Sequence, residues 1–190
     1  MIRVAIIGGI GSGKSHLAKL FGYPIFNADL EVSKIYKKDR KFFIKLKKKL
    51  KDYFFSFPLK KDQLIKFNFN RKKNLKYVTE IVHPLVRKKL NFFLKKNNKK
   101  KIVILDIPLY FENKLNKKKD VIIFVHAKKK DIIERLKRRK NYNKALINKF
   151  KKLQLPLEKK KKKTMHVFKN NFKNDSAKKY VKNILKYILK

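Results

Sequence analysis

GGIGSGKS, residues 8–15, decides the fold class of this chain. The stretch fits the pattern Gly-x4-Gly-Lys-Ser, a loop whose glycines let backbone N–H groups approach phosphate oxygens. The apolar residues 4–7 before it predict a strand, and the pattern over residues 15–21 predicts a helix directly after it. A strand, a phosphate-binding loop and a helix in this order begin an α/β nucleotide-binding domain.

The residues of this loop have expected roles in binding ATP. Lys14 is expected to bridge the β- and γ-phosphates, and the Ser15 hydroxyl is expected to join the coordination shell of Mg²⁺. The alternative is a glycine turn without a ligand, and the strand and helix on its two sides argue against it. The residues expected to contact ATP are Gly8, Gly9, Ile10, Gly11, Ser12, Gly13, Lys14, Ser15 and His16.

The charge of the chain suggests nucleic acid at first, because 56 Lys and Arg against 13 Asp and Glu give a net charge of +43. Only seven of the 56 are arginine, and the plentiful Asn, Ile, Phe and Tyr share A/T-rich codons with lysine. We therefore attribute the lysines to genome composition and expect only non-specific attraction to nucleic acid. The lysine runs, such as residues 159–163, are expected to be solvated.

Other features of the composition exclude whole classes of protein. The chain has no cysteine, which rules out disulfides and thiolate metal sites. Its uncharged apolar runs are too short to span a bilayer, and its first residues do not resemble a signal peptide. We expect a cytoplasmic protein with no membrane partner.

Short continuous apolar runs predict five buried parallel strands, at residues 4–7, 24–26, 102–107, 121–125 and 166–168. Helical patterns cover residues 129–139 and 177–188, the second with Asn174 or Asp175 as its cap. The expected fold is a P-loop kinase, a three-layer α/β/α domain with a five-stranded parallel sheet. Its core would comprise residues 1–29, 100–139 and 157–190, with a helical insertion at 30–99 and a lid at 140–156.

A phosphate-binding loop alone does not choose between kinase, GTPase and motor. The chain has no Asn/Thr-Lys-x-Asp motif of the kind that reads guanine, which argues against a GTPase. Its small size and short spacing favour a kinase that acts on a small molecule.

Several further motifs resemble those of the dephospho-CoA kinase family. They are Phe26-Asn27-Ala28-Asp29, His83-Pro84, LDIPLYFE at 105–112, Gln154-Leu155-Pro156-Leu157-Glu158 and Val167-Phe168-Lys169-Asn170, in the family's order. The resemblance implies transfer of the γ-phosphoryl group of ATP to the ribose 3′-hydroxyl of dephospho-CoA, the last step of coenzyme A synthesis. It implies dephospho-CoA as the small-molecule partner, with ATP and Mg²⁺.

Asp29 is the candidate for the base that accepts the proton of the ribose hydroxyl, since it follows a strand at the carboxyl edge of the sheet. The alternative for Asp29 is an N-cap for a helix from Leu30. Arg135 and Arg139, four residues apart, are expected to share a helix face and to stabilise the transferring phosphoryl group, whereas Arg138 is expected to be solvated.

Asp106 at the end of a strand resembles a carboxylate that holds Mg²⁺ together with Ser15. His83-Pro84 is expected to end one helix, begin the next and shape the substrate pocket. With Asp29 and Pro108, His83 completes the expected substrate-binding residues.

The chain departs from the family's pattern at several positions. Ile7 stands where the family has threonine, Phe172 where it has glycine, and Lys60-Lys61 where it has an Asp-Arg pair. Two other functions remain open, a nucleoside or nucleotide monophosphate kinase and a nucleic-acid-binding P-loop ATPase.

Overall fold

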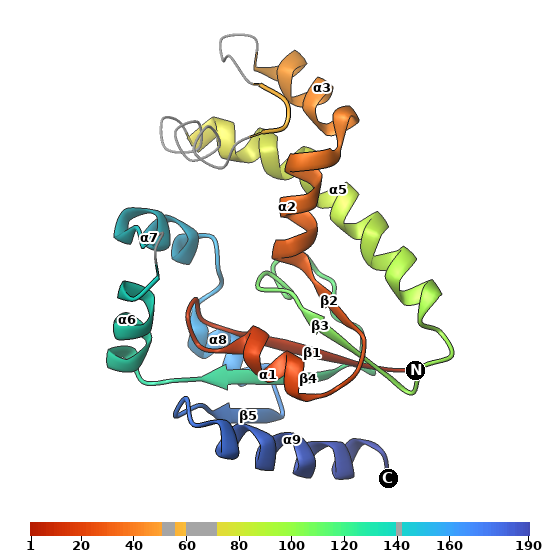
Figure 1. Ribbon diagram of the computed structural model, residues 1–190, viewed down its shortest axis with the longest axis vertical. Helices are drawn as coiled ribbons and strands as arrows, with labels where there is room; N and C mark the ends of the chain where they lie inside the picture. Colours follow the sequence, from red (N-terminus) through yellow and green to blue (C-terminus); the bar gives the residue numbers. More distant parts are fainter. Residues whose placement is uncertain (51–55, 60–71, 140–141) are drawn as a thin grey trace. The chain divides into compact units, whose positions relative to one another are not determined.

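The structure, a computed structural model, describes residues 1–50, 56–59, 72–139 and 142–190 (Figure 1). It divides into two compact units, one formed by Met1–Asn27 with Asn97–Lys190 and the other by Ala28–Lys96. In the described part of the chain, no helix is long and apolar enough to cross a membrane.

The first unit is built on a five-stranded sheet. Its strands are β1 (Ile2–Gly8), β2 (Ile25–Asn27), β3 (Ile102–Asp106), β4 (Val121–His126) and β5 (His166–Lys169). Their order is β2-β3-β1-β4-β5, and every neighbouring pair is parallel. The expected parallel sheet is confirmed, and each strand lies at or beside the apolar run that predicted it.

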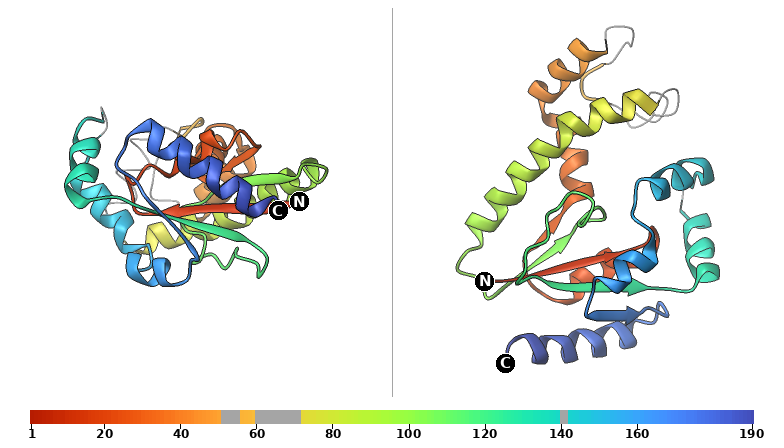
Figure 2. Two further views of the ribbon diagram at one scale, coloured as in Figure 1. Left: turned by 90° about the horizontal axis from the view of Figure 1, so that it is seen from below. Right: turned by 180° about the vertical axis from the view of Figure 1, so that it is seen from behind.

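Two helices cover one face of this sheet, α1 (Lys14–Leu20) and α9 (Asn174–Ile188). Leu17 of α1 and Val181 of α9 join Ile6, Ile104 and side chains from β4 and β5 in one buried apolar cluster. A shorter helix, α8 (Leu157–Lys162), lies on the opposite side of the sheet (Figure 2, left). Helices on both faces explain why the strands are apolar without alternation.

The segment after β3 is fastened to the sheet by a buried polar network. The Tyr110 hydroxyl donates to Asp120 Oδ2 at 2.6 Å and accepts from the guanidinium of Arg3 at 2.7 Å. Burial, followed by the bond to Asp120, raises the pKa of Tyr110 well above its ordinary value. The phenol therefore stays protonated and can keep donating.

The second unit is helical, with α2 (Ala28–Lys38), α3 (Arg40–Lys49) and α5 (Lys72–Lys96). Ile35, Phe42, Leu46, Val78 and Val82 belong to its buried core. The Asp39 side chain caps α3 by accepting a hydrogen bond from the backbone N–H of Phe42 at 2.9 Å.

The prediction that one helix ends at His83-Pro84 is wrong, because Pro84 lies inside the continuous helix α5. Proline removes one hydrogen bond of a helix and usually breaks it. Here Val78 and Val82 before the proline and Leu90 after it are all buried, so packing holds both halves of the helix.

The connection between β4 and β5 contains α6 (Lys129–Lys137), α7 (Lys144–Lys152) and α8. The prediction that α6 extends to residue 139 is wrong, since Arg138 already forms its C-cap. The N-cap of α9 is Lys173, so neither Asn174 nor Asp175 caps this helix. Instead Asn171 accepts a hydrogen bond from the Lys173 N–H at 3.0 Å just before it.

Candidate active site

The phosphate-binding loop joins β1 to α1, and two of its glycines are required by sterics. Gly8 has φ 147°, and a Cβ there would lie 2.5 Å from the carbonyl oxygen of Val125. Gly13 has φ 97°, and a Cβ there would lie 2.3 Å from Nδ2 of Asn170. Only glycine fits both the backbone angle and the space at these positions.

The other two glycines of the loop are where neighbouring helices come close. A Cβ on Gly9 would lie 3.3 Å from Leu157 of α8, and one on Gly11 would lie 3.0 Å from Ile132 and Leu136 of α6. The loop is therefore packed between α6 and α8, the helices that precede and follow α7 in the chain.

Two polar side chains of the loop, those of Lys14 and Ser12, are buried. The Lys14 ammonium donates to the carbonyl oxygen of Gly9 at 2.8 Å, and Lys14 is only 9% exposed. The Ser12 hydroxyl is buried and has no hydrogen-bond partner within the described residues. A buried cation and a free hydroxyl beside glycine N–H groups make a suitable environment for phosphate oxygens.

Asp106, at the end of β3, joins the end of β2 to the first turn of α1. Its Oδ2 accepts a hydrogen bond from the Ser15 hydroxyl at 2.6 Å and another from Asn27 Nδ2 at 2.7 Å. The sheet register places Asp106 opposite Asn27 of β2, which explains the bond to its amide. It also places Asp106 opposite Ile6 of β1, and the loop after β1 leads to Ser15 in the first turn of α1. A hydroxyl and a carboxylate are hard oxygen donors, and this pair fits an ion such as Mg²⁺.

Asn170 supports the loop from behind, and the sequence reasoning did not single it out as a site residue. Its Nδ2 donates to the carbonyl oxygen of Ser12 at 2.8 Å, and its backbone N–H donates to the carbonyl oxygen of His126 at 2.7 Å. Asn170 is 7% exposed. The sequence feature that could have identified Asn170 as a site residue is its position directly after the last strand, at the carboxyl edge of the sheet.

The two arginines expected to act together do not share a helix face. Arg135 lies in the last turn of α6, and its guanidinium carbon is 4.4 Å from the centre of the Phe172 ring. Arg139 lies beyond the end of the helix, and its backbone N–H bonds to the carbonyl oxygen of Leu136. The expected spacing of one helical turn therefore does not apply to this pair.

A buried ion pair joins α8 to the segment after β3. Lys160 Nζ lies 2.7 Å from Glu112 Oε1 and donates to the carbonyl oxygen of Pro108 at 3.0 Å. The same Glu112 oxygen accepts the backbone N–H of Leu155 at 2.7 Å. Lys160 is 1% exposed, so the prediction that residues 159–163 are all solvated is wrong. Composition alone cannot reveal which lysine of a run is buried.

Two other expected site residues, Asp29 and His83, belong to the helical unit. Asp29 lies in the first turn of α2, inside the helix, so the alternative that it caps a helix from Leu30 is wrong. His83 is exposed on α5, and partial burial, followed by the positive charge of Arg87, lowers its pKa. The roles given to Asp29 and His83 stay predictions.

Two of the departures noted in the sequence fall in the described part. Ile7 is 1% exposed and pairs with Phe124 in the sheet, and Phe172 has φ 62°. Lys60 and Lys61 lie outside the described residues.

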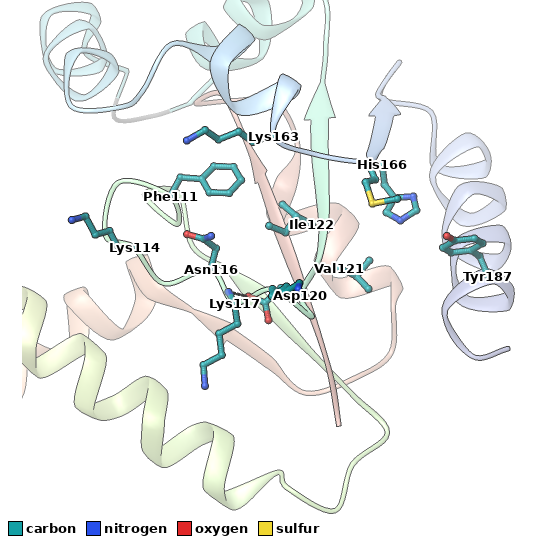
Figure 3. Close-up of a pocket in the computed structure, with 12 residues that line it drawn as sticks. Phe111, Lys114, Asn116, Lys117, Asp120, Val121, Ile122, Lys163, His166 and Tyr187 are labelled. Carbon is teal, nitrogen blue, oxygen red and sulfur yellow. Dashed lines mark hydrogen bonds between the residues drawn. The ribbon is translucent and has the colours of Figure 1, made fainter.

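A hollow of about 760 Å³ lies at the opposite edge of the sheet, where β4 and β5 begin (Figure 3). Val121 and Ile122 line it together with Lys163, His166 and Tyr187. The phosphate-binding loop follows the carboxyl end of β1 and does not contribute to this hollow, which is therefore no part of the candidate site.

The sequence profile of the dephospho-CoA kinase family matches residues 2–177. The chain belongs to this family. The dephospho-CoA kinase of Wolbachia pipientis wMel is 33% identical to it over 164 residues, which cover 84% of each chain.

Solved structures share the fold of this chain. TT1252 from Thermus thermophilus has a TM-score of 0.77 at 25% identity, with 98% of this chain and 97% of that chain covered. Dephospho-CoA kinase from Campylobacter jejuni has a TM-score of 0.66 at 22% identity, with 98% and 96% covered, and shows the same fold. The expected P-loop kinase fold is confirmed, and the chain is a kinase.

Proposed function

We propose that this protein transfers the γ-phosphoryl group of ATP to the ribose 3′-hydroxyl of dephospho-CoA, giving coenzyme A and ADP. The observation that carries the proposal is the meeting of the phosphate-binding loop with Asp106 through Ser15, in a chain of the dephospho-CoA kinase family. The phosphate-binding loop indicates where ATP binds, and membership of the family indicates the acceptor, dephospho-CoA.

Residues of the first unit would hold and polarise the phosphates. On binding ATP, the Lys14 ammonium would exchange the Gly9 carbonyl for β- and γ-phosphate oxygens, which are charged and therefore stronger acceptors. The glycine N–H groups would bind further phosphate oxygens, and Arg135 would neutralise charge on the transferring group. Phosphoryl transfer is served mostly by such positioning and electrostatic stabilisation.

Mg²⁺ would be held by the Ser15 hydroxyl and by the Asp106 carboxylate, directly or through water. Within the described residues, no group of three or more His, Cys, Asp or Glu side chains could hold a metal by itself. A site with few protein ligands suits Mg²⁺, which keeps several waters and binds substrate phosphates. The ion would supply charge neutralisation at the phosphates.

Asp29 is the proposed base for the acceptor hydroxyl. A ribose hydroxyl is a weak nucleophile, and a carboxylate that accepts its proton as the new P–O bond forms makes it a better one. Asp29 follows Asn27, the residue whose amide bonds to Asp106, by two positions in the chain. His83 and Pro108 are proposed to contact the substrate.

An ADP-release assay with alternative acceptors tests the function. The purified protein would be offered dephospho-CoA, AMP, CMP, shikimate and single-stranded DNA in turn, with ATP and Mg²⁺. We expect dephospho-CoA alone to stimulate release, and mass spectrometry of the product to show coenzyme A. Stimulation by AMP or CMP alone would instead support a nucleotide kinase, and stimulation by DNA alone would support a nucleic-acid-binding ATPase.

A further inference from the structure

Phe172 has an unusual backbone conformation beside the phosphate-binding loop. Its φ of 62° lies in the left-handed region, which disfavours bulky side chains. Such strained residues persist only where their surroundings hold them in place, and they cluster at functional sites. Glycine would adopt this angle without strain. A phenylalanine in this strained backbone conformation therefore indicates a role for its side chain.

The Phe172 ring lies between the loop and Arg135. The ring centre is 4.4 Å from the guanidinium carbon of Arg135, and Cε1 is 3.5 Å from where a Cβ on Gly13 would lie. The turn that carries the ring is fixed to the loop, because Asn170 Oδ1 accepts the Phe172 N–H at 2.9 Å while Asn170 Nδ2 donates to Ser12. The ring is thus a fixed surface next to Gly13.

The contact with the ring leaves the hydrogen-bonding edge of Arg135 available. A guanidinium that lies over an aromatic ring is attracted through its face, while its N–H donors point outward in its own plane. In the part of the chain that the structure describes, the Arg135 side chain has no hydrogen bond or ion pair. Its donors can therefore turn to phosphate oxygens without breaking another contact.

We propose that Phe172 is a positioning residue that holds Arg135 beside the phosphate-binding loop. The arginine then meets ATP already oriented, and less side-chain freedom is lost when it binds phosphate. This inference rests on the proposed function only in the role given to Arg135. It explains why a bulky residue occupies a position that suits glycine.

A set of substitutions at Phe172 separates positioning from folding. Phe172→Tyr keeps an aromatic face, Phe172→Leu keeps bulk and strain without a π system, and Phe172→Gly removes both ring and strain. We expect Tyr to retain kcat/KM for ATP, and Leu and Gly each to lower it about 2- to 30-fold, the range of a cation–π contact. Gly should be at least as resistant to heat as Leu, so activity would not follow stability. Tyr187→Leu, which removes a ring at the distant hollow, serves as the matched control.

Two further measurements make the test specific to Arg135. In an Arg135→Gln background, which lacks the cation, Phe172→Leu should have little additional effect on kcat/KM. The side-chain Nε–H resonance of Arg135, assigned by its loss in Arg135→Gln, should shift in Phe172→Leu as the ring current disappears, and this holds with or without substrate.

The inference is overturned if Leu and Gly keep the kcat/KM of the unsubstituted protein, if Gly is both more stable and more active than Phe, or if the arginine resonance does not move. Failure of the proposed function looks different. The unsubstituted protein would then not respond to dephospho-CoA, while the arginine resonance would still report the contact with the ring.

Discussion

At the scale of single residues, Asp106 determines the geometry of the candidate site, because one carboxylate oxygen holds Ser15 of the loop and Asn27 of β2 together. The site is therefore preorganised before any substrate arrives. Hydrogen bonds to a carboxylate are stronger than those between neutral groups, so a carboxylate is well suited to hold the two side chains in place.

Replacing Asp106 should weaken the use of Mg²⁺ in particular. Asp106→Asn keeps the size of the side chain and an acceptor for Ser15 but removes the negative charge that attracts the ion. We expect the Mg²⁺ concentration for half-maximal rate to rise about tenfold or more, the size of effect seen when groups that tune a metal site are changed. A titration of rate against Mg²⁺ at saturating ATP measures this. Asp175→Asn, on the exposed start of α9, is the control, and an unchanged Mg²⁺ requirement in Asp106→Asn would exclude the role.

Asp29 is expected to affect the chemical step and not the binding of ATP. Asp29→Asn should lower kcat about 10²- to 10⁴-fold, the usual contribution of a general base, with little change in ATP affinity. Steady-state kinetics with equilibrium ATP binding separate the two quantities. Glu31→Gln is a matched control on the same helix, where Glu31 forms exposed ion pairs with Lys34 and Lys89. A near-normal kcat in Asp29→Asn would mean that another group accepts the proton.

The single residues also show what a sequence can and cannot predict. The loop and Asp106 could be proposed as site residues because their expected chemistry follows from residue type and local spacing. Asn170, Glu112 and Lys160 were missed because their partners lie far away in the chain. Nothing in a run of five lysines distinguishes the one that folding buries.

At the scale of elements, helices α6 and α8 each contact the phosphate-binding loop at a defined glycine. Leu157 at the start of α8 packs on Gly9, while Lys160 one turn later bonds to Glu112 and to the Pro108 carbonyl. Helix α6 packs on Gly11 through Ile132 and Leu136. These contacts fix both ends of the connection that contains α7, which has no buried residue among those described.

The ion pair that anchors α8 should be costly to break from one side. Lys160→Met would leave the largely buried Glu112 carboxylate without its cation, and we expect the free energy of unfolding to fall by about 3–5 kcal/mol. The double change Lys160→Met with Glu112→Gln removes the unpaired charge, so its loss should be smaller. Denaturation by urea measures both. Lys159→Met alters the same net charge at an exposed position of α8 and should have almost no effect.

Elements were predictable where a pattern was continuous, and their ends were not. The five apolar runs indicated the strands, and the continuous apolar character is clearest in β1 and β3, which are buried along most or all of their length. Pro84 misled because tertiary packing overrides the local preference of proline. The end of α6 at Lys137 was missed because two arginines, which favour helices, follow it in the sequence, and only the turn formed by Arg138 and Arg139 ends it.

At the scale of the whole molecule, the net charge of +43 remains to be reconciled with a kinase of small anions. The positive charge of the lysines attracts anions whether it arose from genome composition or from selection for function. A positive surface potential raises the local concentration of polyanions, and salt screens it over a Debye length of about 10 Å at 0.1 M. Both ATP and the proposed acceptor are anions with more than one negative charge, so the lysines should raise their encounter rates with the site.

This predicts that kcat/KM falls as ionic strength rises, whereas kcat at saturating substrates changes little. The reason is that kcat/KM contains the encounter of free enzyme and substrate, while kcat reports the bound complex, where nearby charges are screened less. Initial rates from about 0.02 to 0.3 M salt, with sodium chloride and potassium acetate compared, measure the effect and separate screening from binding of a particular anion. A flat kcat/KM in both salts would show that the long-range field of the lysines contributes nothing to substrate capture. An equal fall of kcat would instead place the sensitivity to salt in the bound complex.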